Sequence, residues 1–373
     1  ILFALTDILL KNIKPLGWKN SNYRVSFWVI FLSFLSAEVS LRYILKTELT
    51  FTEQNGSHWY SSPYRQIHLQ NILRKYVFKQ EDVCLKISKP NSTVVDRKNE
   101  FSFEHHYNAI GIRERNLPRQ KIDLSNVTLG LGDSFTEGVG THQDSTWLRQ
   151  LETLLLTHDK NALTINGGSN GGDVFTAYYL LEHLLYEYCH PKTIVLNINF
   201  SDINDVIIRG GYERFISHSE MKYNSAPWWE TIYSFSYIFR SVMHNIFHFQ
   251  WNYYTPKEFA QKKEEALEQI DSCLFHQYIP FARQKGIELV VVFSPVQSEI
   301  ESNNFPYVKS KKHLISEGIV VVDLYEDFKK QGGKMSDYFW KTDLHNNAKG
   351  YGVWANAIHQ ELGYGRAIAR NRH

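Results

Sequence analysis

The sequence predicts an α/β fold in which a five-stranded parallel sheet lies between two layers of helices. From residue 127 onward, short apolar runs alternate with longer stretches that have helical spacing. The apolar runs are nearly free of polar residues, as expected of strands that are buried on both faces of a parallel sheet. The chain has 373 residues, 43% of them hydrophobic and 21% charged, which suits a folded α/β domain with additions.

The first 46 residues are predicted to form a membrane anchor region. Residues 25–37 are apolar apart from serines, and up to Leu45 the stretch reaches about 20 residues, enough to cross a bilayer as a helix. Basic residues precede it, which favours a cytoplasmic N-terminal side. Glu38 and Arg42 interrupt its second half, and we expect them either to pair on one helix face or to lie among the lipid headgroups. A buried helix of a soluble domain is the alternative.

Two further segments flank this anchor. Residues 1–10 are mostly apolar, which indicates an interfacial helix or the end of an upstream structure. Residues 47–120 are polar, with three prolines and short strand-like pieces, and are expected to be a juxtamembrane segment that packs on the main domain. The main domain is predicted at residues 121–373.

Within the main domain, strands and helices are expected to alternate. The predicted strands are residues 127–131, 162–166, 193–200, 287–293 and 319–324. The predicted helices are residues 146–156, 175–188, 257–285 with a break near Pro280, and 347–362. Sites in such sheets form at the carboxyl ends of the strands.

An aromatic-rich insert, residues 206–256, interrupts this alternation after the third strand. Because it follows a strand end, we expect it beside the site, as a lid or an acceptor groove for sugars or acyl chains. Trp228 and Trp229 are its candidate substrate contacts. A helical insert with its own apolar face, or a surface that packs on a membrane or a partner, is the alternative.

Two distant motifs predict the chemistry. Gly132-Asp133-Ser134 ends the first strand, and Asp343-Leu344-His345 lies near the end of the chain. A serine hydroxyl is a weak nucleophile until a base takes its proton, and His345 is the candidate base. Asp343 would hold the imidazole tautomer and stabilise the imidazolium. The N–H groups of Ser134 and of Gly171, in a glycine-rich turn, are candidate donors to an oxyanion.

These motifs resemble the characteristic blocks of the GDSL, or SGNH, hydrolases. Residues 132–138 are similar to the first block, residues 166–171 to the second, whose last glycine gives an oxyanion N–H, and residues 343–350 to the last. Residues 107–113 also resemble a segment that precedes the serine in membrane-anchored bacterial members. The resemblance covers roughly residues 105–362. It implies a flavodoxin-like three-layer sandwich and ester or acyl-group chemistry.

The third block departs from the family pattern Gly-x-Asn-Asp, whose Asn side chain is the third oxyanion donor. Ser201 stands where this Asn is expected, just before Asp202. Asn199 and Asn204 are candidate substitutes. Losing one such donor can cost about 10²–10³ in rate, so activity is predicted to depend on this position.

The other polar residues near the motifs have simpler interpretations. Asp133 is expected to cap the helix after the serine or to orient its turn. Together with Asn170 and Asp202 it is also a candidate substrate contact. Glu137 is interpreted as a residue that favours the helix dipole. His105 and its neighbour His106 are interpreted as surface residues.

The composition adds three negative expectations. No cysteine or histidine pair has metal-ligand spacing, and no cofactor motif occurs, so neither a metal nor a cofactor is predicted. The net charge of +2 gives no reason to expect nucleic acid as a partner.

The sequence supports two functional hypotheses. The first is a serine esterase or O-acyltransferase that acts on acyl esters, chiefly acetyl esters, of cell-envelope glycans. It would be a single-pass inner-membrane protein with its catalytic domain on the periplasmic, or extracytoplasmic, side. The second is a catalytically impaired domain that serves as a structural or binding subunit of a membrane assembly. The Ser201 departure, the aromatic insert and the apolar N-terminus motivate the second hypothesis.

Overall fold

The computed structural model describes the greater part of the chain, namely residues 21–44, 77–80, 83–116, 126–215, 223–249 and 253–364. The expectations for residues 1–10, for residues 47–76 and for residues 216–222 and 250–252 of the insert lie outside these ranges. The chain divides into two units. Residues 1–62 and 227–256 form the first, and residues 63–226 and 257–373 form the second. The second half of the predicted insert therefore belongs with the N-terminal helix.

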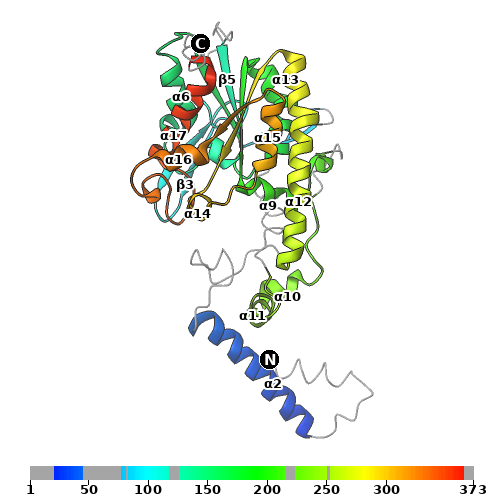
Figure 1. The fold of residues 1–373 in the computed structure, drawn as a ribbon. Coiled ribbons are helices and arrows are strands. Elements are labelled where there is room, and N and C mark those ends of the chain that lie inside the picture. The colour runs from blue at the N-terminus through cyan, green and yellow to red at the C-terminus, as the bar shows by residue number, and fades with distance from the viewer. Residues whose placement is uncertain are drawn as a thin grey trace. The chain divides into compact units, whose positions relative to one another are not determined.

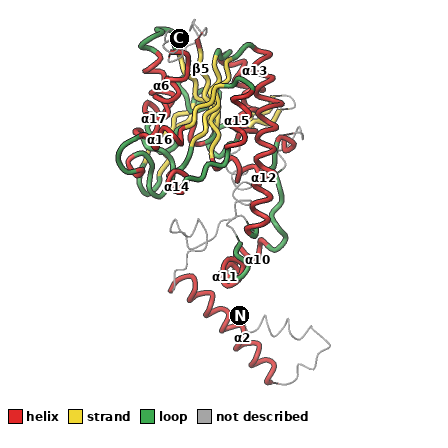
Figure 2. Tube along the Cα trace, in the orientation of Figure 1, coloured by secondary structure: helices red, strands yellow, loops and turns green. Residues whose placement is uncertain are grey.

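The second unit contains a parallel sheet of five strands in the order β6-β5-β7-β8-β9 (Figure 2). Numbered along the chain this order is 2-1-3-4-5, the flavodoxin-like arrangement, and it confirms the predicted fold class. The sequence pattern placed each strand to within two residues. The strands are β5 (Val127–Gly132), β6 (Leu163–Gly168), β7 (Thr193–Asn199), β8 (Glu288–Ser294) and β9 (Val320–Asp323).

Helices cover both faces of this sheet (Figure 1). On one face, α6 (Trp147–Leu155), α16 (Leu324–Lys330) and α17 (Ala348–His359) pack on β7, β8 and β9 through a core that includes Trp147 and Trp354. On the other face lie α12 (Pro256–Cys273), α13 (Ile279–Lys285) and α15 (Val308–Ser316). These apolar layers hold the carboxyl ends of the strands in place.

Long helices of this unit contain wide turns. Helix α12 continues into α13 through a π-helical segment, Leu274–Tyr278, so Pro280 falls in the first turn of α13. Proline lacks an N–H and cannot complete the ladder, and the wide turn before it absorbs that loss without ending the helix. The predicted helix 175–188 is similarly divided into α7 (Val174–Leu180), a π-helical turn and α8 (Tyr186–Cys189).

Two antiparallel hairpins precede the sheet in the second unit. They are β1–β2 (Val77–Gln80 and Val83–Lys86) and β3–β4 (Ser92–Arg97 and Ser102–Tyr107). After them, the buried guanidinium of Arg113 donates to the carbonyls of Glu137, Gly138 and Thr141. The segment before residue 121 is thus bonded directly to the turn that follows Ser134.

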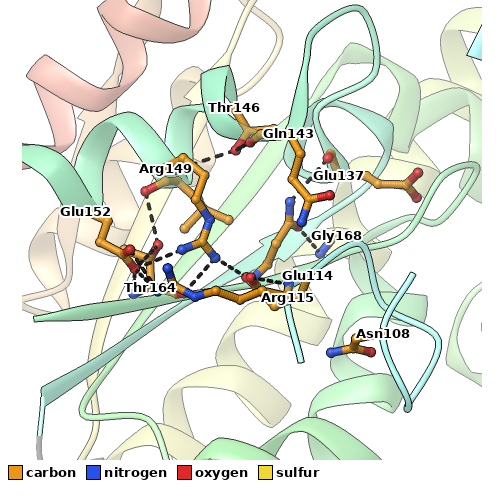
Figure 3. Close-up of polar contacts among 12 residues, drawn as sticks. Asn108, Glu114, Arg115, Glu137, Gln143, Thr146, Arg149, Glu152, Thr164 and Gly168 are labelled. Atoms are coloured by element: carbon orange, nitrogen blue, oxygen red, sulfur yellow. Dashed lines mark hydrogen bonds and ion pairs between the residues drawn. The ribbon is translucent and has the colours of Figure 1, made fainter. Parts of the chain in front are cut away.

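A buried ion network joins the same segment to the sheet (Figure 3). Arg149 bonds to the carboxylate of Glu114 and lies 2.9 Å from that of Glu152. Glu114 also accepts the N–H of Asn166 at 2.9 Å, and Glu152 that of Thr164 at 2.7 Å. Burial raises the pKa of Glu114, whereas the charge of Arg149 and the hydrogen bonds lower it, with a net rise. Arg149 thus pairs with both carboxylates, which accept N–H groups of strand β6, and Arg115 lies 2.8 Å from Glu152 as a second partner.

The described part of the first unit contains α2 (Ser21–Val39), a π-helical turn at Ser40–Ile44, α10 (Glu230–Phe235) and α11 (Tyr237–Asn245). Val25–Tyr43 is long and apolar enough to cross a membrane, with 19 residues and a mean hydropathy of 1.5. A signal sequence near the N-terminus meets the same criterion of length and composition.

Candidate active site

Ser134 is the first residue of α5 (Ser134–Glu137), directly after β5. The turn depends on Gly132, whose φ is +148° and where an added Cβ would lie 2.5 Å from Thr136 Oγ1. Asp133 caps the helix by accepting the N–H of Phe135 at 3.0 Å, as the sequence predicted. A short helix with a fixed start thus presents the hydroxyl of Ser134 at the carboxyl edge of the sheet.

The structure brings Ser134, His345 and Asp343 together. His345 Nε2 lies 2.8 Å from Ser134 Oγ, and His345 Nδ1 bonds to the carboxylate of Asp343. Burial alone would raise the pKa of Asp343, but the hydrogen bond and charge of His345, with the charge of Lys98, hold it below its usual value. The imidazole is supported by the ring of Phe135, with the ring centroids 4.5 Å apart.

The acid and the base flank a single residue with unusual backbone geometry. Leu344 has a φ of +70°, in the left-handed region that non-glycine residues seldom adopt. The loop around it is closed by two backbone bonds, from Trp340 N to His345 O and from Leu344 N to Trp340 O. Such strain persists only where neighbouring structure enforces it, so this loop needs external support.

The hairpin β3–β4 supplies such support. The carboxylate of Glu100, at its tip, accepts the N–H groups of Lys341 and Thr342 at 3.2 and 2.6 Å, and the hydroxyl of Thr342 at 2.7 Å. Lys98 Nζ lies 3.7 Å from the carboxylate of Asp343. Glu100 and Lys98 were not identified from the sequence, because no motif marks a hairpin tip that lies some 240 residues before the loop it holds.

Replacing Glu100 with glutamine is expected to lower kcat/KM for an activated ester by about tenfold or more. Glutamine replaces the charged acceptor of three solvent-exposed hydrogen bonds with a neutral one, and a tenfold loss of rate corresponds to about 1.4 kcal/mol. The rate of ester hydrolysis measures the effect. Glu104→Gln, on the same hairpin but exposed beside His106, is the matched control. Equal rates for both variants would contradict a positioning role. So would a fall in the melting temperature of Glu100→Gln large enough to account for its lower rate by unfolding.

The glycine-rich turn after β6 packs against the serine helix. An added Cβ at Gly168 would lie 2.1 Å from Glu137 N, so only glycine allows this approach. Asn170 N donates to Glu137 Oε2 at 2.7 Å, and the carbonyl of Gly171 accepts from Arg209. The two predicted oxyanion donors, Ser134 and Gly171, therefore lie on turns that Glu137 links directly.

Glu137 and His105 differ from their predicted roles. Both are buried, and His105 Nδ1 lies 3.1 Å from Glu137 Oε1, which also accepts the hydroxyl of Tyr107 at 2.9 Å. Burial would raise the pKa of Glu137, but the hydrogen bond and charge of His105 and the charge of Arg113 hold it below its usual value. The interpretation of His105 as a surface residue was wrong, whereas its neighbour His106 is exposed. Glu137 acts through a side-chain network in addition to its place in the first helical turn.

Two of the candidate third oxyanion donors, Ser201 and Asn199, bond to Asp133. Ser201 Oγ lies 2.9 Å from Asp133 Oδ2 and 2.7 Å from Asn199 Oδ1, and Asn199 Nδ2 donates to Asp133 Oδ2 at 2.8 Å. Asn199 also caps α9 (Phe200–Arg209) in a capping box with Asp202. The hydroxyl of Ser201 and the amide of Asn199 are thus engaged in one buried cluster. Asn199 therefore has a structural role at the start of α9.

The remaining predicted substrate contacts differ in burial and in the unit to which they belong. Asp133 and Asp202 are buried, and their carboxylates accept hydrogen bonds from within the protein. Burial raises the pKa of both, and for Asp202 the charge of Asp133 raises it further. Neither carboxylate is therefore exposed to a substrate, which corrects that prediction. Asn170 is exposed on the glycine-rich turn. Trp228 and Trp229 belong to the first unit, whereas the triad belongs to the second.

Within the described ranges, no cluster of three or more histidine, cysteine or acidic side chains is arranged to hold a metal ion. In the same ranges, the thiols of Cys189 and Cys273 are free and buried.

No family model matches the sequence, and no curated protein matches it. Several solved esterases and lipases have a similar fold. A lipase/acylhydrolase from Enterococcus faecalis is 12% identical, with 64% of this chain and 95% of that chain covered and a TM-score of 0.38. A member of the lipolytic protein G-D-S-L family from Veillonella parvula is 13% identical, with 64% and 98% covered and a TM-score of 0.36. A two-domain esterase active on acetylated mannans is 10% identical, with 64% and 50% covered and a TM-score of 0.38. Likeness at this level carries no functional argument, so the function is inferred from the geometry of the site.

Proposed function

We propose that the protein is a membrane-anchored, extracytoplasmic serine esterase or O-acyltransferase. The observation that carries this proposal is the continuous chain of hydrogen bonds from Ser134 through His345 to Asp343. Nucleophile and base lie within the distance that proton transfer requires, and the base is oriented by an ionised carboxylate. Ser134 comes from one chain segment of the second unit, and His345 and Asp343 come from the other. Their arrangement is the one that acyl transfer needs.

In the proposed reaction, Ser134 Oγ attacks the carbonyl carbon of an acyl ester while its proton passes to His345 Nε2. Asp343 accepts a hydrogen bond from Nδ1 and stabilises the imidazolium that forms. The N–H groups of Ser134 and Gly171 stabilise the negative oxygen. The proton on Nε2 then goes to the leaving alcohol, and an acyl-serine remains. Water or a sugar hydroxyl, deprotonated by His345, attacks this ester, and Ser134 recovers its proton.

A cleft beside the triad loop supports a glycan as substrate or acceptor. It has a volume of about 390 Å³ and lies between the hairpin β3–β4 and the loop that leads to His345. Phe103 and Trp340 contribute aromatic surface to it, and His142, Asp337 and Lys349 contribute polar groups. Sugar rings bind to such combinations of flat apolar faces and hydrogen-bonding side chains. Acetyl esters of cell-envelope glycans are the substrate class that the family resemblance implies.

A second function is favoured by one observation, the engagement of Ser201 and Asn199 with Asp133. If these groups stay in place during the reaction, the oxyanion has two donors where three are usual, at a cost of about 10²–10³ in rate. The domain would then serve as a structural or binding subunit of a membrane assembly. This function predicts no turnover of any activated ester.

Labelling with a fluorophosphonate probe separates the two functions. The wild-type chain is expected to form a covalent adduct, and Ser134→Ala is expected to form none. Ser316→Ala, an exposed serine on α15 that bonds only to a local carbonyl, serves as the control and should label like the wild type. Absence of labelling in the wild type, or equal labelling of Ser134→Ala, would remove Ser134 from the mechanism.

A further inference from the structure

Glu38 of α2 and Arg42 of the π-helical turn that follows it contact the helices of the insert. The carboxylate of Glu38 accepts the hydroxyl of Ser236 and the N–H groups of Tyr237 and Ile238, at the start of α11. Arg42 donates to the carbonyl of Phe235 at 3.1 Å, and its guanidinium lies over the ring of Tyr237. Glu38 and Arg42 thus form hydrogen bonds with the backbone where α10 ends and α11 begins.

Other charged side chains of the first unit also point inward. Arg240 on α11 is fully buried and donates to the carbonyls of Tyr233 and Ser234. Glu230 is buried and accepts the hydroxyl of Ser234. In a water-soluble domain such groups lie at the surface, because burying a charge is costly unless it is paired.

Many large apolar side chains are exposed on the described residues of this unit. Trp228 is 87% exposed, Ile246 65% and Phe235 64%. The large apolar side chains exposed in this unit include Val25, Val29, Ile30, Phe31, Leu32, Phe34, Leu35 and Val39 from α2, and Trp228, Ile232, Phe235, Ile246 and Phe247 from the insert. Charged groups inside and apolar groups outside are the reverse of what water favours, and they are the arrangement of proteins in lipid.

An apolar groove lies between the exposed apolar side chains of α2 and those of the insert. It lies between α2 and α10, has a volume of about 650 Å³, and is lined by Phe34, Leu35 and Val39 on one side and Ile232 and Phe235 on the other. The three apolar lining residues of α2 are themselves 47–49% exposed and belong to the helix that is long enough to cross a bilayer. A groove with this lining fits an acyl chain of a phospholipid.

We propose that residues 227–249 of the insert are a second membrane element, embedded with α2 in the lipid bilayer. The proposal rests on α2 being the anchor of the proposed function, and it assigns the aromatic insert to lipid instead of substrate. Helices α10 and α11 are too short to cross a bilayer, so they lie in its interfacial region beside the C-terminal part of α2. Glu38 and Arg42 bind them there, where an unpaired charge would be costly.

Site-specific fluorescence in vesicles tests the proposal. The full chain, in a Cys84→Ser background that leaves only the buried Cys189 and Cys273, receives a single environment-sensitive label. Labels are attached at Phe247→Cys on the insert, at Leu32→Cys on α2 and at Lys309→Cys, whose side chain is 89% exposed on α15. The proteins are reconstituted in phosphatidylcholine–phosphatidylglycerol vesicles, and quenching by spin-labelled lipid is compared with quenching by iodide.

The label at residue 247 is expected to behave like that at residue 32, with blue-shifted emission, strong quenching by lipid and protection from iodide. The label at residue 309 should show the opposite pattern. If residue 247 is quenched by iodide while residue 32 is quenched by lipid, the anchor stands and the proposal is wrong. If residue 247 is shielded from both quenchers, a second copy or another protein covers it, and the proposal is also wrong. If residue 32 is not quenched by lipid, the anchor fails together with the proposal, whereas fluorophosphonate labelling of Ser134 is unaffected.

Discussion

Replacing Asp343 with asparagine is expected to lower kcat for p-nitrophenyl acetate by about 10⁴-fold, while the protein stays folded. The asparagine amide fits the same space, but it can donate a hydrogen bond to His345 Nδ1. The imidazole would then carry its proton on Nε2, the atom that must accept the proton of Ser134 2.8 Å away. The loss of the carboxylate also removes the charge that stabilises the imidazolium. Initial rates under saturating ester measure the change.

Asp144→Asn is the matched control for this variant. Asp144 is an acidic residue whose side chain is 83% exposed beside His142, and its replacement should leave kcat unchanged. A wild-type kcat for Asp343→Asn would show that the contact between Asp343 and His345 has no part in turnover. If Asp343→Asn is largely unfolded at the assay temperature, the lower rate is explained by loss of folded protein.

Replacing Arg149 with methionine is expected to lower the free energy of unfolding by about 3–5 kcal/mol near pH 8. The arginine bonds to Glu114, whose side chain is fully buried, and to Glu152, which is largely buried (Figure 3). Without it, the buried carboxylate of Glu114 loses its arginine, whereas Glu152 keeps Arg115 at 2.8 Å. Urea unfolding followed by circular dichroism measures the difference. Arg283→Met removes an exposed pair with Glu317 and should cost at most about 1 kcal/mol.

The same variant is expected to recover part of its stability near pH 5. Burial already raises the pKa of Glu114 in the folded protein, and loss of the Arg149 charge raises it further. An acid whose pKa is higher in the folded than in the unfolded state costs stability as pH rises through that interval. The difference from wild type should therefore shrink as pH falls, and a difference that grows at low pH would contradict this account of the network.

The sheet of the second unit could be predicted from the sequence because each strand is specified locally. A run such as residues 193–199 is buried on both faces, so its composition alone identifies it. The long helices could be predicted for the same reason, from apolar spacing. Their wide turns could not, because a π-helical segment such as Leu274–Tyr278 leaves almost no trace in that spacing.

Elements whose stability comes from distant partners were missed. The hairpin β3–β4 has exposed valines and few core residues, and its tip is held by residues 341 and 342 far along the chain. The insert was treated as one segment on the basis of its aromatic content. Its second half groups with residues 1–62 because Glu38 caps α11, an interaction that no local pattern reveals.

At the candidate site, the sequence predicted which side chains would meet but not how they are held. Ser134, His345 and Asp343 were selected from short motifs and do lie in contact. Their roles in catalysis remain predictions, which fluorophosphonate labelling and the asparagine variant test. The partners of Glu137 and Asp133 were not foreseen, because a carboxylate beside a turn has the same sequence appearance whether it faces solvent, a buried histidine or a serine.

Ser134 and His345 are 211 residues apart along the chain. A nascent polypeptide leaves the ribosome from its N-terminus, so the nucleophile and the hairpin that bears Glu100 emerge long before their base. Helix α17 follows His345 directly and packs on α6. It must also emerge before the loop with His345 can pack against the domain. Translation therefore delivers a chain that is chemically inert until the segment with His345 has been made, and any product truncated before residue 345 is expected to lack the proton acceptor.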